Sequence, residues 1–196
     1  MKSNVFCLNR LFCLLAALFV ALTVSVVHAT DYTINGPVGP NNYVSLEALR
    51  NAGITWQNND TITLDGNDDT LTAAFDFGSG NNVTIQGSGT IKPSGNGIRF
   101  ANSGNITIDS GTGVLLFDGF NTTGSGGAIS GTSVTFSGGI NSFSGNTATN
   151  NGGAIYAIAN AILIADVGDI TFQGNKANGS SNAIHMENGG GGKTLP

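Results

Sequence analysis

The chain has 196 residues, of which 30 are glycine and only 10% are charged. Its formal net charge of −5 argues against nucleic acid and anionic membrane surfaces as partners, so we expect no nucleic acid to bind. Cys7 and Cys13 are the only cysteines, so the sequence after them can form neither disulfides nor thiolate metal sites.

Residues 1–29 have the pattern of an export signal. Lys2 and Arg10 are their only charges, residues 11–27 form an apolar run, and Val27-His28-Ala29 offers small residues at a cleavage site. An uncleaved membrane anchor is the alternative, because an apolar run of about 17 residues is at the lower limit for a span. Cleavage would leave five bases (7 − 2) against 12 acids, and the net charge would fall to −7 (5 − 12).

Residues 30–57 are predicted to form an extended lead-in and an N-terminal cap. Ser45 can cap a short helix over residues 45–52, with Glu47 in its first turn and Leu49 on its apolar face. Such a helix would cover the open end of a stack of strands, which a solenoid needs to stay soluble. Trp56 is expected to join the apolar contacts of this cap.

Short β-rich segments recur after the cap and predict a parallel β-helix over residues 58–188. Hydrophobic residues alternate with threonine in most of them, which is typical of strands with one buried face. Counted from Ile62, they recur at intervals of roughly 20 to 30 residues, as expected for the coils of a solenoid. The segments are Thr61-Ile62-Thr63-Leu64, Val83-Thr84-Ile85, Ile106-Thr107-Ile108, Val134-Thr135-Phe136 and Ile162-Leu163-Ile164.

One set of motifs appears three times between residues 117 and 184. In each copy a phenylalanine precedes a Gly-Gly-Ala-Ile tetrapeptide, or its remnant, by nine residues. The interval between copies lengthens from the first pair to the second while this offset stays constant, so the added residues fall in a loop outside the motif. The copies are Phe117 with Gly126, Gly127, Ala128 and Ile129; Phe143 with Asn146, Gly152, Gly153, Ala154 and Ile155; and Phe172 with Asn175 and the remnant Ser181-Asn182-Ala183-Ile184.

Each part of the motif has an expected structural role. The glycine pair supplies a positive φ at a corner where a Cβ would clash. The phenylalanine and isoleucine side chains face the interior. Asn146 and Asn175 are expected to bond through their amides to backbone or to the asparagine of the next coil. Phe120 stands in place of asparagine in the first copy.

Two intact copies of Gly-Gly-Ala-Ile and of Phe-x-x-Asn at a constant offset resemble the repeats of the polymorphic outer membrane proteins of chlamydiae. That family consists of autotransporter adhesins. The resemblance implies a right-handed parallel β-helix of the pectate-lyase-like kind, located at the outer membrane, on the cell surface or outside the cell. It further implies adhesion to a host-cell or surface receptor, with neighbouring β-helices as additional partners.

The end of the sequence departs from that family. A C-terminal β-barrel in the same chain carries such passengers across the outer membrane, but no series of amphipathic strands for one is present here. Residues 189–196 are instead expected to form a flexible glycine-rich tail. Either the reading frame is truncated, or the protein is a short secreted relative.

The acidic segment Asp65-Gly66-Asn67-Asp68-Asp69, with Asp76, resembles a calcium loop in its spacing. Thr70 stands where such a loop needs glycine, so a solvated turn is the preferred interpretation. Arg99 and Lys92 are candidate bases for a lyase, but no pattern places them beside these acids.

The remaining chemistry is sparse. His185 has no Gly-x-Ser-x-Gly elbow to accompany it, which argues against a catalytic triad with Ser180 or Ser181. We therefore expect a non-enzymatic module with no catalytic residue, metal or cofactor. The alternatives are a small secreted polysaccharide lyase or glycoside hydrolase on the same fold, and a translated fragment with no role of its own.

Overall fold

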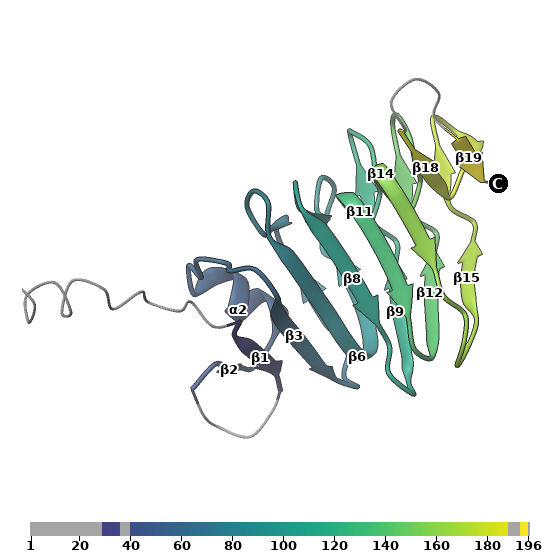
Figure 1. Ribbon diagram of the computed structural model, residues 1–196. Coiled ribbons are helices and arrows are strands. Elements are labelled where there is room, and N and C mark those ends of the chain that lie inside the picture. Colours follow the sequence, from purple (N-terminus) through teal and green to yellow (C-terminus); the bar gives the residue numbers. More distant parts are fainter. Residues whose placement is uncertain (1–28, 36–39, 188–192, 196) are drawn as a thin grey trace, which may run out of the picture.

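A computed structural model describes residues 29–35, 40–187 and 193–195, the last three by their backbone alone. Parallel strands stack into a β-helix of about six turns, as expected from the sequence (Figure 1). The predicted export signal lies outside the described residues except for Ala29. Within the described part of the chain, no helix has the length and hydrophobicity needed to cross a membrane.

Each complete coil contains three walls of strands and a short corner strip between the second and third walls. The first wall consists of β1 (Asp31–Ile34), β3 (Asp60–Asp65), the first half of β6 (Asn82–Pro93), β8 (Asn105–Asp109) and the second halves of β11 (Ile129–Ser137) and β14 (Ile155–Leu163). The second wall consists of β4 (Asp69–Leu71), the second half of β6, β9 (Val114–Asp118), β12 (Ile140–Ser144) and β15 (Ile170–Gln173).

The third wall and the corner strip are made of shorter strands. The third wall consists of β5 (Phe75–Asp76), β7 (Phe100–Ala101), the first halves of β11 and β14, and β18 (Ile184–Met186). The corner strip consists of β10 (Asn121–Thr122), β13 (Thr147–Ala148) and β16 (Lys176–Ala177). Three further strands lie at the ends: β2 (Asn42–Tyr43), β17 (Ser180–Ser181) and β19 (Lys193–Leu195).

The strand pairing of the first wall differs from the predicted register at two places. Val83 pairs with Asp60 rather than Ile62, so the first coil is longer than the spacing between Ile62 and Val83 predicts. At the other end, Val134 pairs with Ala161, because β14 carries an irregularity in register after Ala157. Ile162 is therefore the partner of an outward-facing threonine, and its side chain is exposed instead of buried.

Phenylalanines stack along the second wall. Phe117, Phe143 and Phe172 are partners on three successive coils, and their ring centroids are 4.9 and 5.2 Å apart with nearly parallel planes. Phe117 and Phe143 are fully buried, whereas Phe172 on the last coil is only partly covered. The spacing is close to that of neighbouring strands, so the backbone ladder itself imposes the ring stacking.

A buried asparagine ladder fixes the corner that follows the second wall. Asn146 donates its side-chain amide to the carbonyl of Phe117 and to Oδ1 of Asn175, and its own Oδ1 accepts from the N–H of Phe120. Asn175 repeats the arrangement by donating to the carbonyl of Phe143. The expected amide bonds are confirmed, and Phe120 does occupy the equivalent position on the coil before.

The glycine pairs form the next corner. Gly126 and Gly152 have φ values of +75° and +63°, in the left-handed region that glycine adopts without strain. A Cβ at Gly127 would overlap the carbonyl oxygen of Gly153, so the second glycine is required by the close approach of consecutive coils. The alanine and isoleucine that follow each pair are fully buried on the third wall; they are Ala128, Ile129, Ala154 and Ile155.

The N-terminal end of the stack is closed. Helix α2 (Leu46–Asn51) begins after the predicted N-cap Ser45, whose Oγ accepts from the N–H of Ala48, and it buries Leu46 and Leu49 completely. Trp56 lies edge-on against Tyr32 and Phe77, at 5.3 and 5.0 Å between ring centroids. The cap and the role of Trp56 in it are thus confirmed.

The C-terminal end is closed over only part of its outline. β17 pairs antiparallel with β16 beside the corner strip, and β19 pairs antiparallel with β18 beside the third wall. β19 lies within the segment expected to be a tail, while residues 189–192 and Pro196 lie outside the described part. The first and second walls end at β14 and β15 with no strand beyond them among the described residues.

Phe143→Asp should lower the stability of the β-helix by more than about 4 kcal/mol, because it places an unpaired carboxylate between two stacked rings. Ser142→Asp is the matched control, since Ser142 lies on the outer face of the same strand and an added carboxylate there stays solvated. Thermal melting followed by circular dichroism checks both. Equal melting temperatures for the two variants would show that Phe143 is not inside.

Asn146→Ala should lower the free energy of unfolding by about 2 to 3 kcal/mol, because it removes the amide from the ladder and leaves the buried carbonyl of Phe117 without its partner. Asn121→Ala, at the exposed neighbouring position on the previous coil, should change the denaturation midpoint little. A loss of similar size in both variants would contradict the ladder as the source of the stability.

Candidate functional site

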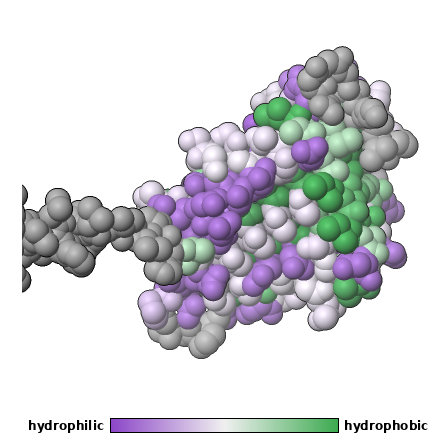
Figure 2. All heavy atoms as spheres, in the orientation of Figure 1, coloured by the Kyte–Doolittle hydropathy of each residue, from purple (hydrophilic) through white to green (hydrophobic). Residues whose placement is uncertain are grey.

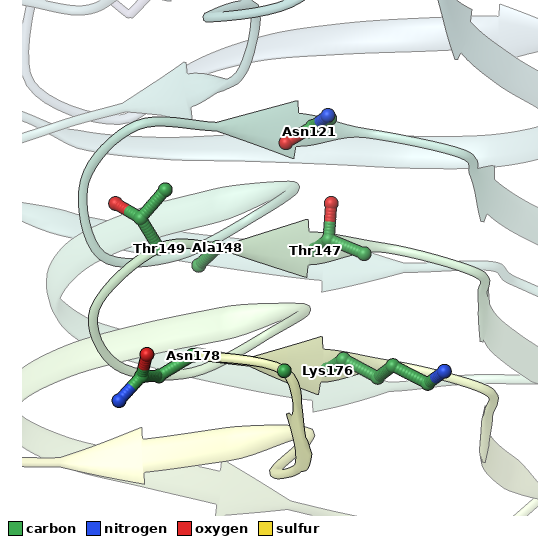
Figure 3. Close-up of a pocket in the computed structure, with 7 residues that line it drawn as sticks. Asn121, Thr147, Ala148, Thr149, Lys176 and Asn178 are labelled. Atoms are coloured by element: carbon green, nitrogen blue, oxygen red, sulfur yellow. The ribbon is translucent and has the colours of Figure 1, made fainter.

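A groove runs along the corner strip, and it is the candidate binding site of this fold. Its cavity has a volume of about 360 Å³ and is lined by Asn121, Thr147, Ala148, Thr149, Lys176, Asn178 and Gly179. Figure 3 shows the side chains of Asn121, Thr147 and Lys176 on three successive rungs of the solenoid, one from each of β10, β13 and β16. We call this site the corner groove.

The repeat motif determines which residues line the corner groove. Asn146 and Asn175 point inward, so alternation along the strand turns the next residues, Thr147 and Lys176, outward. Asn121 is their counterpart on the previous coil because it pairs with Thr147. Sequence reasoning missed all three side chains. The signal was available, since each of them follows the ladder position of its copy directly.

The chemistry of the corner groove is hydrogen bonding with one positive charge. Thr149 and Asn178 add a hydroxyl and an amide to those of Thr147 and Asn121. Within the described part of the chain no carboxylate forms an ion pair with the Lys176 ammonium. These groups can hold polar or anionic groups of a ligand.

A second, smaller cavity of about 330 Å³ brings together an acid and a base that the sequence did not connect. Asp76 and Arg99 both line it, together with residues of the turn at 122–124. Arg99 donates to the carbonyl of Ser125 at 2.5 Å, and Asp76 accepts from the N–H of Gly78 at 2.8 Å. Both side chains thus hold backbone groups of the scaffold. The other candidate base, Lys92, lies 4.0 Å from Asp118 in an exposed pair.

The carboxylates of the acidic segment do not converge on one point. The Asp65 carboxylate accepts from the side chain of Asn67 within an exposed turn, as the solvated-turn interpretation requires. Asp69, in contrast, is buried and occupies the second-wall position that Ile91 fills on the next coil. Among the described residues no group of three or more His, Cys, Asp or Glu side chains is placed to hold a metal ion.

Asp69 holds the capping helix to the stack. Its Oδ1 accepts from the N–H of Leu46 at the start of α2, at 3.1 Å. Glu47 forms a second link, because its Oε2 accepts from the N–H of Thr72. The Arg50 guanidinium bonds to Glu47 and lowers the pKa of that carboxyl to about 2, whereas burial raises the pKa of Asp69 above its usual value.

His185 does not form part of a triad in this structure. It lies on β18, and its ring stacks on that of Tyr156 with 5.8 Å between centroids. No hydrogen bond connects it to Ser180 or Ser181 within the described residues, and its buried Nδ1 has no partner there.

The chain matches no protein-family model, no curated protein and no solved structure. The fold defines the protein as a β-solenoid of the parallel β-helix class, with a surface groove that is lined mainly by residues with polar groups. The likeness to the chlamydial repeats rests on the motif residues alone.

Asp69→Asn should stabilise the protein at neutral pH by about 1 kcal/mol, because the amide keeps an acceptor for Leu46 and removes a buried charge. Since the pKa of Asp69 is raised in the folded state, its ionisation costs stability as the pH rises through the usual aspartate range toward that raised pKa. The gain should therefore shrink as the pH is lowered to the usual aspartate range. Denaturant midpoints across this pH range measure it, with Asp65→Asn as the exposed control. A gain that did not depend on pH would contradict the assignment.

Proposed function

We propose that this protein is an exported binding module, a β-helix passenger of the adhesin type, whose corner groove contacts the ligand. Its receptor is a molecule of a host cell or other surface. The observation that carries the proposal is a separation of structural and surface residues within each repeat. The recurring residues build the buried scaffold, and the residue that follows the ladder position faces the groove.

The separation suits binding for a physical reason. Groove residues change without disturbing the core, because the ladder of asparagine and phenylalanine supplies the packing. The groove also crosses three rungs, so side chains distant in the sequence reach one ligand together. The groups on offer hydrogen-bond and carry charge, as the recognition of a polar surface molecule requires.

Export is tested by immunoblotting fractionated source cells with antibody raised against residues 30–196. We expect the antigen in the outer-membrane fraction or the medium, and protease added to intact cells should remove any cell-associated band. A band confined to the cytoplasm at the size of the uncleaved chain would contradict export. A large band in the outer-membrane fraction would mean that the module belongs to a longer polypeptide.

Binding is tested with beads that carry the purified protein, added to cultured host cells. Thr147→Trp fills the corner groove and should reduce bead attachment by at least about tenfold, the effect typical of a blocked contact at an interface centre. Thr84→Trp is the matched control, because Thr84 is also a half-buried threonine on a strand but faces out of the first wall. Equal attachment of both variants, or calcium-dependent cleavage of an acidic polysaccharide, would contradict the proposal.

A further inference from the structure

The last coil exposes a hydrophobic patch that the rest of the stack does not. Most of the large hydrophobic side chains with substantial exposure belong to this coil, and the patch is completed by partly buried residues of β14 and β15. Figure 2 shows hydrophobic residues gathered at the end of the molecule where β14 lies in Figure 1. We call this surface the end patch; it consists of Ile158, Ile162, Leu163, Ile164 and Val167, which are 40% to 64% exposed, with Ala161, Ile170 and Phe172.

Leu163 is exposed and Phe172 is partly exposed in the end patch because the buried ladders stop there, whereas Ile162 faces out of the first wall. Leu163 continues the row that contains Phe136, and Phe172 continues the row of Phe143, but no coil covers either of them among the described residues. Five aliphatic side chains, each about half exposed, present apolar surface on the order of 400 Å², within the range of patches that mark interaction sites.

β15 adds an unpaired strand edge to the patch. Among the described residues it pairs only with β12. The carbonyls of Asp169 and Gln173 accept from β12 and the residue after it, so by alternation the N–H and C=O groups of Ile170 and Phe172 point away from the stack. An exposed edge of this kind pairs readily with another strand.

We propose that a second copy of this chain covers the end patch, giving a two-fold symmetric dimer joined end to end. The opposite end of the solenoid is closed by α2 and the aromatic cluster around Trp56, so head-to-tail stacking into a filament has no second open face. A contact between like ends is then isologous and closes after two copies.

The chemistry of the patch suits self-association. Residues 158–164 and 170–173 contain no charged side chain, so like-charge repulsion between two copies is confined to the turn between them, where the exposed Asp166 and Asp169 flank Val167. Two patches together with two β15 edges bring the buried surface to the order of 1,000 Å², about the lower limit for a specific interface. The dimer buries the ends of both hydrophobic ladders at the same time.

The free groups of β15 also select a register for the contact, the one that uses the N–H and C=O groups of both Ile170 and Phe172. In an antiparallel pair, residues that point their N–H and C=O groups at the partner face one another, so Ile170 pairs with Phe172 of the second copy. Thr171 then faces Thr171 of the second copy in a position without hydrogen bonds. Opposed Cα atoms there are roughly 4.5 Å apart, within the range that a disulfide can bridge.

A cysteine at this position tests the geometry. The full chain is expressed with Cys7 and Cys13 replaced by serine, and Thr171→Cys is compared with Ser142→Cys after mild oxidation of the purified product. Ser142 is the partner of Thr171 one rung inward on the same face, so its cysteine is separated from the second copy by β15. We expect a covalent dimer from Thr171→Cys alone. No cross-link, or equal cross-linking of both variants, would overturn the proposal.

Sedimentation velocity of the cysteine-free product tests the assembly itself. We expect a concentration-dependent monomer–dimer equilibrium, which Leu163→Glu should weaken at least about tenfold by placing a charge in the contact. Val44→Glu is the control, because Val44 is the most exposed large hydrophobic residue described and lies near the closed end. Circular dichroism confirms that each variant is folded, and the cysteine test decides the matter should Leu163→Glu not fold. A monomer at all concentrations, or open-ended filaments, would overturn the proposal.

Discussion

The structure depends on the hydrogen bonds that each coil makes with the coils before and after it. Every wall strand directs its backbone N–H and C=O groups along the solenoid axis. The hydrogen bonds of one coil are therefore complete only when the neighbouring coils have strands at the same positions. This requirement forces the inward side chains into continuous rows of similar residues. The stacked rings of Phe117 and Phe143 are one such row.

The asparagine ladder solves the hardest part of this problem, the corner between walls. Strand pairing is interrupted there, and buried carbonyls such as that of Phe117 need another donor. The side chain of Asn146 supplies one and links to Asn175 on the next coil at the same time. A corner built in this way has a fixed shape, so the residues just outside it are held in fixed positions along the groove.

The two ends of the stack follow from the same constraint in opposite ways. At the first coil, Asp69 stands in a row that is otherwise hydrophobic, and its carboxylate accepts from the helix that closes the end. At the last coil the rows end in Leu163 and Phe172, which carry hydrophobic surface and no polar group to attach a cap. The N-terminal end is thus closed by polar contacts to a helix, whereas the first and second walls end in hydrophobic side chains with no strand beyond them among the described residues.

The sequence by itself determined the fold class, the helix at residues 46–51 with its N-cap Ser45, and the register of the three motif copies. These features depend on local spacing and on motifs that recur from one coil to the next, so they can be recognised in the sequence alone. The tertiary structure alone decided that Val83 pairs with Asp60 and that Ile162 faces outward, because register depends on which residues neighbouring coils bring together. It also decided which side chains meet across coils in the groove. Asn121, Thr147 and Lys176 are each a full coil apart in the sequence, and only the stacking of the coils makes them neighbours.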